Sequence, residues 1–345
     1  MKKSYKQLIF LGVMALVLSI LAACGGDEGA TTTEAEGTSN GEAQVLKVAF
    51  NQPENHPQYK AMQEFGEKLK ERTNGAYEIE IFPNELLGAQ RETIELVQTG
   101  TIAMSIVAGS LLENFNEDFA VFNLPYVFES AEHQMSVLNN QEVVGDLYSS
   151  LKDQGIFVAG AFHSGVRNVY NSEKPINTPE DLNGLKIRII ESDTNIKMME
   201  QMGGTGTPMG QGEVYTAIQS GVIDGGENNE LIYANLKHAE IAPYYSYTKH
   251  LMFPDYLLIN SQLFDGMSEE HQQIFKEELL AAIDREVEMW DEDVQKAIAD
   301  AEAAGAKFNE VDVELFRKAT ESIVQEKLTT DNAKALYEKV REAAK

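Results

Sequence analysis

The sequence EEHQQIFKEELLAAIDREVEMWDEDVQKAIADAEAA, residues 269–304, carries an apolar side chain at every third or fourth position from Phe275 to Ala301. This spacing is helical and continues without a break. Ser268 can cap the N-terminus of the helix, and Gly305 can close its C-terminus. The pattern therefore predicts one continuous helix, about 54 Å long at ~1.5 Å per residue.

Such a helix is longer than the roughly 30 Å diameter of a small domain. Two interpretations fit it: the helix runs along two lobes of one monomer, or its apolar stripe is the seam of a coiled-coil dimer. The chain that follows residue 44 is about 300 residues long, which is too long for one simple core. We therefore expect two lobes, with the long helix running along both.

Strand-like and helix-like segments alternate along the chain, so the expected fold class is α/β. The predicted strands are Leu46–Phe50, Tyr77–Phe82, Ile102–Val107, Ile156–Ala161, Leu185–Ile190 and Val222–Asp224. Amphipathic helices are predicted at Tyr59–Arg72 and Glu92–Gln98. Ligands of open α/β sheets bind beyond the carboxyl ends of the strands. The segments that follow these strands are therefore candidates for a binding site: Asn51, Pro83–Gln90, Ala108–Gly109, His163–Arg167 and Gly225–Asn229.

The first 44 residues differ from the rest in composition. Three lysines precede the apolar run Leu8–Ala23, which is shorter than the roughly 20 residues needed to span a bilayer and so favours a cleaved export signal. The run ends in LAAC, residues 21–24, which resembles a bacterial lipobox, although an ordinary secretory signal could also contain Cys24. We expect a signal peptide at residues 1–23 and, at residues 24–44, a lipidated Cys24 with a flexible tether that holds the protein on the outer face of the cell membrane.

The charge and the missing motifs exclude several classes of function. A net charge of −27 argues against nucleic acid as a partner. Cys24 is the only cysteine, so the exported chain cannot form an internal disulfide. No Gly-x-Ser-x-Gly or His-x-x-x-His spacing is present, and the stretch Gly204–Met209 lacks the third glycine of a dinucleotide-binding pattern. We therefore expect no enzyme activity, no metal and no cofactor.

Three linked stretches carry the binding hypothesis: HSGVRNVY at 163–170, TPEDLNGLKIR at 178–188 and PMGQGEVYTAIQSGVIDGGENN at 208–229. In the second stretch, Arg188 lies on the predicted strand opposite Leu185 and Ile187. The planar guanidinium of arginine matches a carboxylate in two parallel hydrogen bonds. A salt-bridged surface arginine is the alternative interpretation.

In this order and spacing, the three stretches resemble the receptor subunit of tripartite ATP-independent periplasmic (TRAP) transporters, in the dicarboxylate-binding branch. The resemblance covers about residues 45–335. It implies a two-lobed clamshell of the periplasmic-binding-protein type, with a long helix spanning both lobes. The expected lobe I comprises residues 45–164 and 254–294, and the expected lobe II comprises residues 165–253 and 295–345.

The resemblance also implies roles for individual residues. Arg188 would form the bidentate bond to a ligand carboxylate, and Arg167 would support that carboxylate from the neighbouring strand. Asn228 would bond the same end of the ligand, with Glu227 beside it. From lobe I, Asn51 and Gln90 would touch the rest of the ligand.

The segments around Tyr170 and His250 resemble family members that bind sugar acids such as uronates. In that case Tyr170, His250 and also His56 would line the pocket, with a hydrogen-bonded framework histidine as the alternative. A sialic acid is not expected, because Ala108 and Leu111 stand where sialic-acid receptors have charged residues.

The expected function is therefore a solute receptor that binds a small organic acid and delivers it to membrane permease subunits. A uronate is the expected ligand. The alternatives are a C4-dicarboxylate or another organic acid, a receptor for an ATP-driven importer, and a structural or adhesive lipoprotein.

Overall fold

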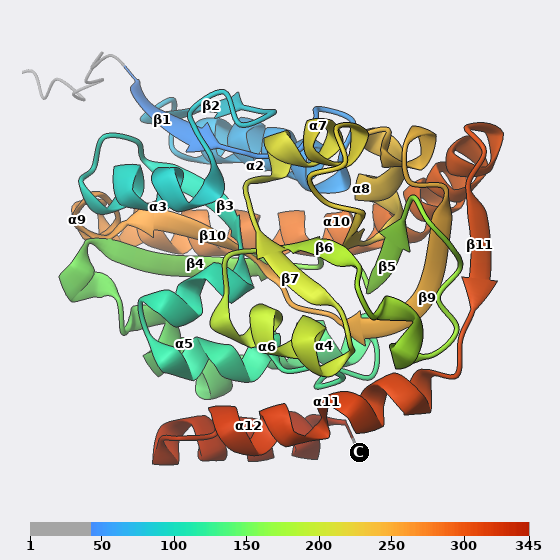
Figure 1. Cartoon of the computed structure of the whole chain (residues 1–345). Coiled ribbons are helices and arrows are strands. Elements are labelled where there is room, and N and C mark those ends of the chain that lie inside the picture. Colours follow the sequence, from blue (N-terminus) through green and yellow to red (C-terminus); the bar gives the residue numbers. More distant parts are fainter. Residues whose placement is uncertain (1–42, 345) are drawn as a thin grey trace, which may run out of the picture. The chain divides into compact units, whose positions relative to one another are not determined.

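The computed structural model describes residues 43–344, which form one compact unit. The predicted signal peptide, Cys24 and all but the end of the predicted tether lie outside the described residues. Two sheets organise the described part of the chain (Figure 1). We call the part built on the first sheet lobe I and the part built on the second sheet lobe II.

The sheet of lobe I has five strands in the order β2-β1-β3-β10-β4. Their bounds are β1 Gln44–Ala49, β2 Tyr77–Phe82, β3 Met104–Ala108, β4 Ile156–Phe162 and β10 Asp255–Asn260. β1 runs parallel to β2 and β3, whereas β10 runs antiparallel to β3 and β4. The helices of this lobe are α2 Pro57–Arg72, α3 Gln90–Gln98, α4 Ala131–Leu138, α5 Gln141–Ser149 and α9 Ser261–Asp265.

The sheet of lobe II has six strands in the order β11-β9-β5-β8-β6-β7. Their bounds are β5 Arg167–Asn171, β6 Lys186–Ile189, β7 Thr205–Pro208, β8 Gly225–Asn228, β9 Tyr244–Leu251 and β11 Lys307–Glu310. β5 runs antiparallel to β8 and β9, and β6 runs parallel to β7 and β8. The helices of this lobe are α6 Asp193–Gln201, α7 Val214–Gln219 and α8 Glu230–Asn235.

A single helix, α10, spans Glu269–Ala303 and packs against α2 of lobe I and α8 of lobe II. Near its start, Phe275 lies in the core of lobe I, and farther along Trp290 packs with Leu231 of α8. The hydroxyl of Ser268 accepts a hydrogen bond from the backbone N–H of His271, which is the predicted N-terminal cap. The continuous helix along both lobes is therefore confirmed, and much of its apolar stripe is covered within one chain.

The C-terminal helices cross from one lobe to the other. α11, Val313–Lys327, packs on α6 and β9 of lobe II. α12, Asp331–Ala343, packs instead on α4 and on the 3₁₀ segment Glu117–Asn123, where Leu336 and Val340 join Val137 and Leu138 in one apolar core. All of residues 295–345 were expected in lobe II, and the return of the chain to lobe I at α12 was not predicted.

The predicted strand Val222–Asp224 is wrong. Val222 is 57 % exposed, and its backbone N–H bonds back to the carbonyl of Ala217, so the segment closes α7 as a turn. The strand begins at Gly225 and is fully buried. Strands β5, β7, β9, β10 and β11 were not predicted.

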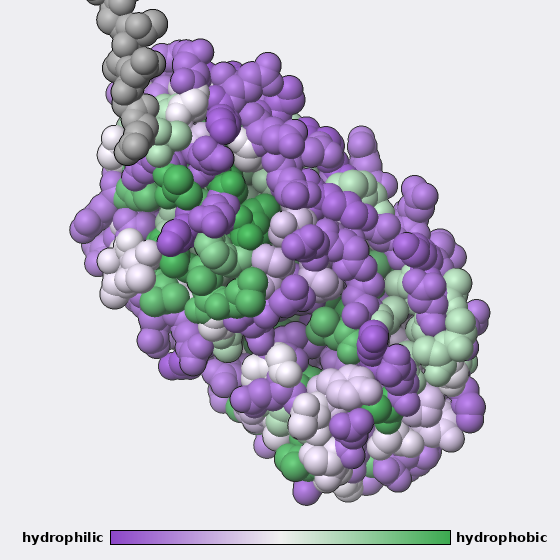
Figure 2. Space-filling model, turned by 90° about the horizontal axis from the view of Figure 1, so that it is seen from above, coloured by the Kyte–Doolittle hydropathy of each residue, from purple (hydrophilic) through white to green (hydrophobic). Residues whose placement is uncertain are grey.

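Charged and polar residues dominate the surface. Hydrophilic residues cover most of the face shown in Figure 2, in keeping with the net charge of −27. Among residues 43–344, no helix combines the length and the apolar character that crossing a bilayer requires.

Two glycines with nearly the same backbone geometry provide a test of the packing. Gly155 and Gly184 have φ values of 83° and 84°. A Cβ at Gly155 would collide with the backbone carbonyl of Gln98, whereas a Cβ at Gly184 would meet nothing within 4 Å. Gly184→Ala should cost about 1–2 kcal/mol for the left-handed backbone alone. Gly155→Ala should cost about 1–3 kcal/mol more, because α3 and the start of β4 must also move apart.

Urea unfolding followed by circular dichroism measures both free energies. Equal losses in the two variants would contradict the close approach of Gln98 to Gly155.

Candidate functional site

A cavity that is partly open to solvent lies between the lobes. Each of the five segments that the sequence analysis placed after a strand contributes to its wall. The lining residues are Asn51, Gln52, His56, Glu85, Ala89, Gln90, Arg91, Ala108, Leu111, Ser164, Arg167, Arg188, Ile190, Glu191, Met209, Gly210, Gln211, Asn228, Ile232, Phe253 and Asp255. The strand-end rule therefore located the cavity correctly.

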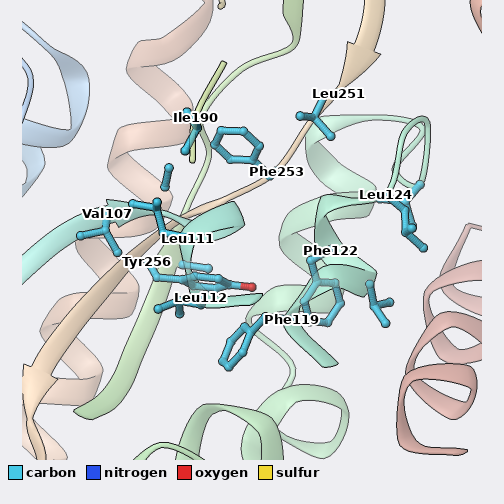
Figure 3. Close-up of a cluster of buried hydrophobic side chains, with 14 of the residues drawn as sticks. Val107, Leu111, Leu112, Phe119, Phe122, Leu124, Ile190, Leu251, Phe253 and Tyr256 are labelled. Atoms are coloured by element: carbon cyan, nitrogen blue, oxygen red, sulfur yellow. The ribbon is translucent and has the colours of Figure 1, made fainter. Parts of the chain in front are cut away.

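Part of the wall is apolar and is shared by both lobes. Leu111 comes from the 3₁₀ segment Gly109–Asn114, Ile190 follows β6, and Phe253 precedes β10. Figure 3 shows Ile190 and Phe253 close together at one edge of a buried apolar cluster that also contains Leu111. A wall of this kind excludes water and strengthens the electrostatic interactions of the charged groups beside it.

Arg188 is a buried cation without a carboxylate partner. It is 4 % exposed, and no carboxylate of residues 43–344 lies within 4.0 Å of its guanidinium group. Its Nε and Nη2 donate to the carbonyl of Met209 at 3.0 and 2.8 Å, and its Nη1 lies 3.5 Å from Oε1 of Gln211. Three of its five N–H groups are thereby used, which leaves two. Burial lowers the pKa of Arg188.

Arg167, in contrast, already has a partner. Its Nε donates to Oε2 of Glu227 at 2.5 Å, and its Nη2 donates to Oε1 at 2.8 Å and to the backbone carbonyl at 2.7 Å. Its Nη1 donates to Oδ1 of Asn228 at 2.9 Å. Four of the five N–H groups are used. Arg167 therefore contributes one N–H to the cavity and little net charge.

The pKa of Glu227 reflects this pairing. Burial alone would raise that pKa, but Arg167 and His250 outweigh burial and lower it to about 2. Nε2 of His250 lies 3.5 Å from Oε2 of Glu227, which is too far for a good hydrogen bond.

Gln211 connects the two arginines, and the sequence analysis did not single it out. Its Oε1 lies 3.5 Å from Nη1 of Arg188 and 3.4 Å from Nδ2 of Asn228. Its Nε2 is buried without a hydrogen-bond partner. The second lobe thus presents unused donors from Arg188, Arg167 and Gln211.

Lobe I presents two unused acceptors. Oε1 of Gln52 and Oε1 of Glu85 are buried without a partner, and burial raises the pKa of Glu85. Oε1 of Gln90 accepts from the backbone N–H of Ala108 at 2.9 Å, which holds the Gln90 side chain against the end of β3. Asn51 lines the cavity beside Gln52.

Asp255 is a further residue that the sequence analysis missed. It is the first residue of β10, and it pairs with Ala108 and Phe162 at the ends of β3 and β4. Its Oδ2 accepts hydrogen bonds from Gln58 and Ser164, both at 2.9 Å. Burial raises the pKa of Asp255. Because β10 runs antiparallel to its neighbours, its first residue reaches the edge at which their last residues lie.

Three of the expected pocket residues do not line the cavity. Tyr170 bonds Nδ1 of His238 at 2.7 Å and stacks on Tyr245. His250 bonds Oγ1 of Thr248 at 2.8 Å, and Glu227 is held by Arg167. All three are at most 1 % exposed. They support the wall from behind, which corrects the expectation that Tyr170 and His250 face the cavity.

His56 does line the cavity, and it also has a framework role. Its Nδ1 accepts from the backbone N–H of Gln58 at 3.3 Å and so caps α2. Burial, assisted by Lys60, lowers the pKa of His56 to about 3, which keeps its ring neutral. Among residues 43–344, no group of three or more His, Cys, Asp and Glu side chains is arranged to hold a metal ion.

Polar contacts join the lobes around the cavity. Oε2 of Glu85 accepts from the backbone N–H of Gly212 at 2.9 Å, and Nδ2 of Asn114 donates to the carbonyl of Glu191 at 3.1 Å. Oε1 of Glu113 accepts from the backbone N–H of Thr194 at 3.0 Å. The two lobes are therefore in direct contact around the cavity.

The buried pair of Arg167 and Glu227 predicts a large loss of stability when it is broken. Glu227→Gln should lower the free energy of unfolding by about 3–5 kcal/mol at pH 7, because Arg167 is left buried without a counter-charge. The folded-state pKa of Glu227 lies below its ordinary value of 4.5. The stabilisation is therefore present above pH 4.5 and is lost as the pH falls toward 2.

Urea unfolding of both proteins between pH 7 and pH 3 measures this difference. Glu314→Gln, which breaks the exposed pair with Arg317, is the matched control and should behave as the wild type. A Glu227→Gln protein as stable as the wild type at pH 7 would contradict the assignment.

Comparison with known proteins identifies the family. Residues 48–331 match the family model of the bacterial extracellular solute-binding proteins, family 7. The 2,3-diketo-L-gulonate-binding periplasmic protein of Escherichia coli is 32 % identical over 282 residues, which are 82 % of this chain and 85 % of that protein.

Two solved structures share the fold. A TRAP periplasmic solute-binding protein from Anaerococcus prevotii, with bound D-glucuronate, superimposes with a TM-score of 0.84 at 36 % identity, over 87 % of this chain and 97 % of that one. A second, from Xanthobacter autotrophicus with bound β-D-galacturonate, has a TM-score of 0.83 at 31 % identity, over 86 % and 99 % of the two chains. With its two lobes, its spanning helix and a cleft between them, the chain belongs to family 7 of the bacterial extracellular solute-binding proteins and is a solute receptor of the TRAP type.

Proposed function

We propose that the cavity binds a sugar acid of the uronate class and that the receptor delivers this acid, chemically unchanged, to the permease subunits of a TRAP transporter. The observation that carries the proposal is the Arg188 guanidinium, which is buried at the cavity with two unused N–H groups and no carboxylate of its own. A buried cation of this kind is costly unless an anion joins it. The carboxylate of a ligand would supply that anion.

The rest of the cavity suits a polyhydroxylated acid. Apolar and polar side chains of both lobes line it, as in most small-molecule sites. Unpaired acceptors on lobe I and unpaired donors on lobe II provide partners for hydroxyl groups. Two relatives with the same fold hold glucuronate and galacturonate, which supports the same class of ligand for this chain.

The mechanism that we propose is a shift between an open and a closed form. Arg188, Arg167, Gln211 and Asn228 come from lobe II, whereas Asn51, Gln52, Glu85 and Gln90 come from lobe I. A ligand bonded to both sets is held fully only when the lobes are closed, so its binding favours the closed form. The closed form is then the one that the permease subunits receive.

Substitution of Arg188 tests the assignment of the carboxylate. Arg188→Ala should weaken binding by about 2–5 kcal/mol, because the ligand anion loses its charged partner. Arg188→Lys should also weaken binding, because an ammonium group cannot form two parallel hydrogen bonds to one carboxylate. Isothermal titration calorimetry with D-glucuronate and D-galacturonate measures both effects.

Lys186→Ala is the matched control, because Lys186 is exposed on the same strand. It should retain the wild-type affinity. An Arg188→Ala protein with near-native affinity would refute the role of Arg188. A thermal-shift screen of uronates, aldonates, C4-dicarboxylates and 2-oxo acids decides among the classes of acid, and recovery of the bound acid unchanged excludes turnover.

We further propose that the receptor is a lipoprotein anchored through Cys24, on the basis of the LAAC pattern at residues 21–24. In a bacterial host, the mature chain should begin with an acylated Cys24 and sediment with membranes. The Cys24→Ser chain should not be acylated. Mass spectrometry of the N-terminal peptide measures this, and an unacylated wild-type N-terminus would indicate an ordinary secretory signal.

A further inference from the structure

Two side-chain oxygens on the lobe I side of the cavity have no hydrogen-bond partner. They are Oε1 of Glu85, in the turn after β2, and Oε1 of Gln52, just after β1. A buried acceptor without a donor costs free energy that a ligand can recover. The unused groups on lobe II are donors instead, from Arg188 and Gln211. Both oxygens are therefore available to a donor group of the ligand.

The backbone brings the turn that carries Glu85 against the segment that carries Gln52. The backbone N–H of Asn84 donates to the carbonyl of Gln52, and that of Glu85 donates to the carbonyl of Phe50. Asn84 and Glu85 both have a φ of 56°, which is a backbone conformation that residues other than glycine rarely adopt. Two successive residues in this conformation cost free energy, so the surrounding contacts must hold the turn in place.

Glu85 also contacts lobe II. One of its oxygens, Oε2, accepts from the backbone N–H of Gly212, the neighbour of Gln211. Its other oxygen, Oε1, is left for the cavity. Glu85 does not form an ion pair with Arg188 within 4.0 Å, although the two charges attract each other. When a ligand carboxylate binds Arg188, Glu85 therefore remains free to accept a hydrogen bond from another part of the ligand.

We propose that Glu85, together with Gln52, determines specificity by accepting hydroxyl groups of the ligand and by rejecting a second carboxylate. This inference rests on the proposed function of the same cavity. A hydroxyl group has a proton to donate to either oxygen. An ionised carboxylate has no proton to donate, and it would meet the charge of Glu85 in a site that is partly shielded from water. The preferred ligand is thus a monocarboxylate with hydroxyl groups, and a dicarboxylate is excluded.

Binding of three acids by four proteins tests the proposal. D-Gluconate and D-glucarate share their carbon chain and differ only in one terminal group, which is a hydroxymethyl in the first and a carboxylate in the second. D-Glucuronate is the third ligand. The proteins are the wild type, Glu85→Gln, Glu85→Ala and the control Glu80→Gln, whose side chain is exposed on the strand that leads into the turn. Calorimetry at pH 8 keeps the carboxylates ionised, and thermal unfolding checks that each variant is folded.

The wild type should bind D-glucarate about 10- to 100-fold more weakly than D-gluconate, because like charges meet. In the Glu85→Gln protein, the ratio of the dissociation constant of D-glucarate to that of D-gluconate should be smaller by at least about 10-fold. Glu85→Ala should weaken D-glucuronate binding by about 10-fold or more, because a hydrogen bond to a charged acceptor is lost. Glu80→Gln should match the wild type in all three titrations.

Two results would overturn the inference while leaving the proposed function intact. One is a Glu85→Ala protein that binds D-glucuronate within twofold of the wild type. The other is a Glu85→Gln protein in which the ratio of the affinities for D-gluconate and D-glucarate is the same as in the wild type. A folded wild type that binds D-glucarate but neither D-gluconate nor D-glucuronate would overturn the proposed function itself.

Discussion

Two guanidinium groups are buried beside one cavity, and only one of them has a carboxylate of its own. Glu227 neutralises Arg167, while Arg188 is held by the carbonyl of Met209 and the side chain of Gln211, which are dipoles rather than charges. Two like charges repel strongly where water is excluded. The ion pair of Arg167 with Glu227 therefore makes it possible to bury Arg188 next to it. Asn228 bonds to Arg167, and Gln211 bonds to Arg188.

The lobes meet through two kinds of contact, and each suits a different task. Apolar side chains such as Leu111, Ile190 and Phe253 belong to one core that extends through both lobes, and α10 packs on both. Exposing that surface to water would cost free energy in proportion to its area. The contacts of Glu85 with Gly212 and of Glu113 with Thr194 are hydrogen bonds, which water can replace at a small net cost. In the opening that we propose, the polar contacts would break at little cost, while α10 would keep the lobes joined.

Much of the site could be predicted because strand ends are local features. Arg188, Arg167, Asn228, Asn51 and Gln90 all line the cavity, as the segments that follow strands in an α/β fold should. Tyr170 does not, because it lies three residues farther along β5 than Arg167, away from the strand end at the cavity, where its hydroxyl bonds His238. Asp255 could not be predicted, since its place at the cavity depends on the antiparallel insertion of β10 between β3 and β4.

The sequence by itself determined the features that depend on near neighbours. These are the alternation of strands and helices, the helix that begins after Ser268 and continues to Ala303, and the placement of Arg188 on a strand. Only the tertiary structure decided which charges are paired. Arg167 meets Glu227, 60 residues away, because β5 and β8 become neighbours, whereas Arg188 meets no carboxylate. A local pattern of residues cannot encode that difference, because the free energy of a buried charge depends on which distant group the fold brings beside it.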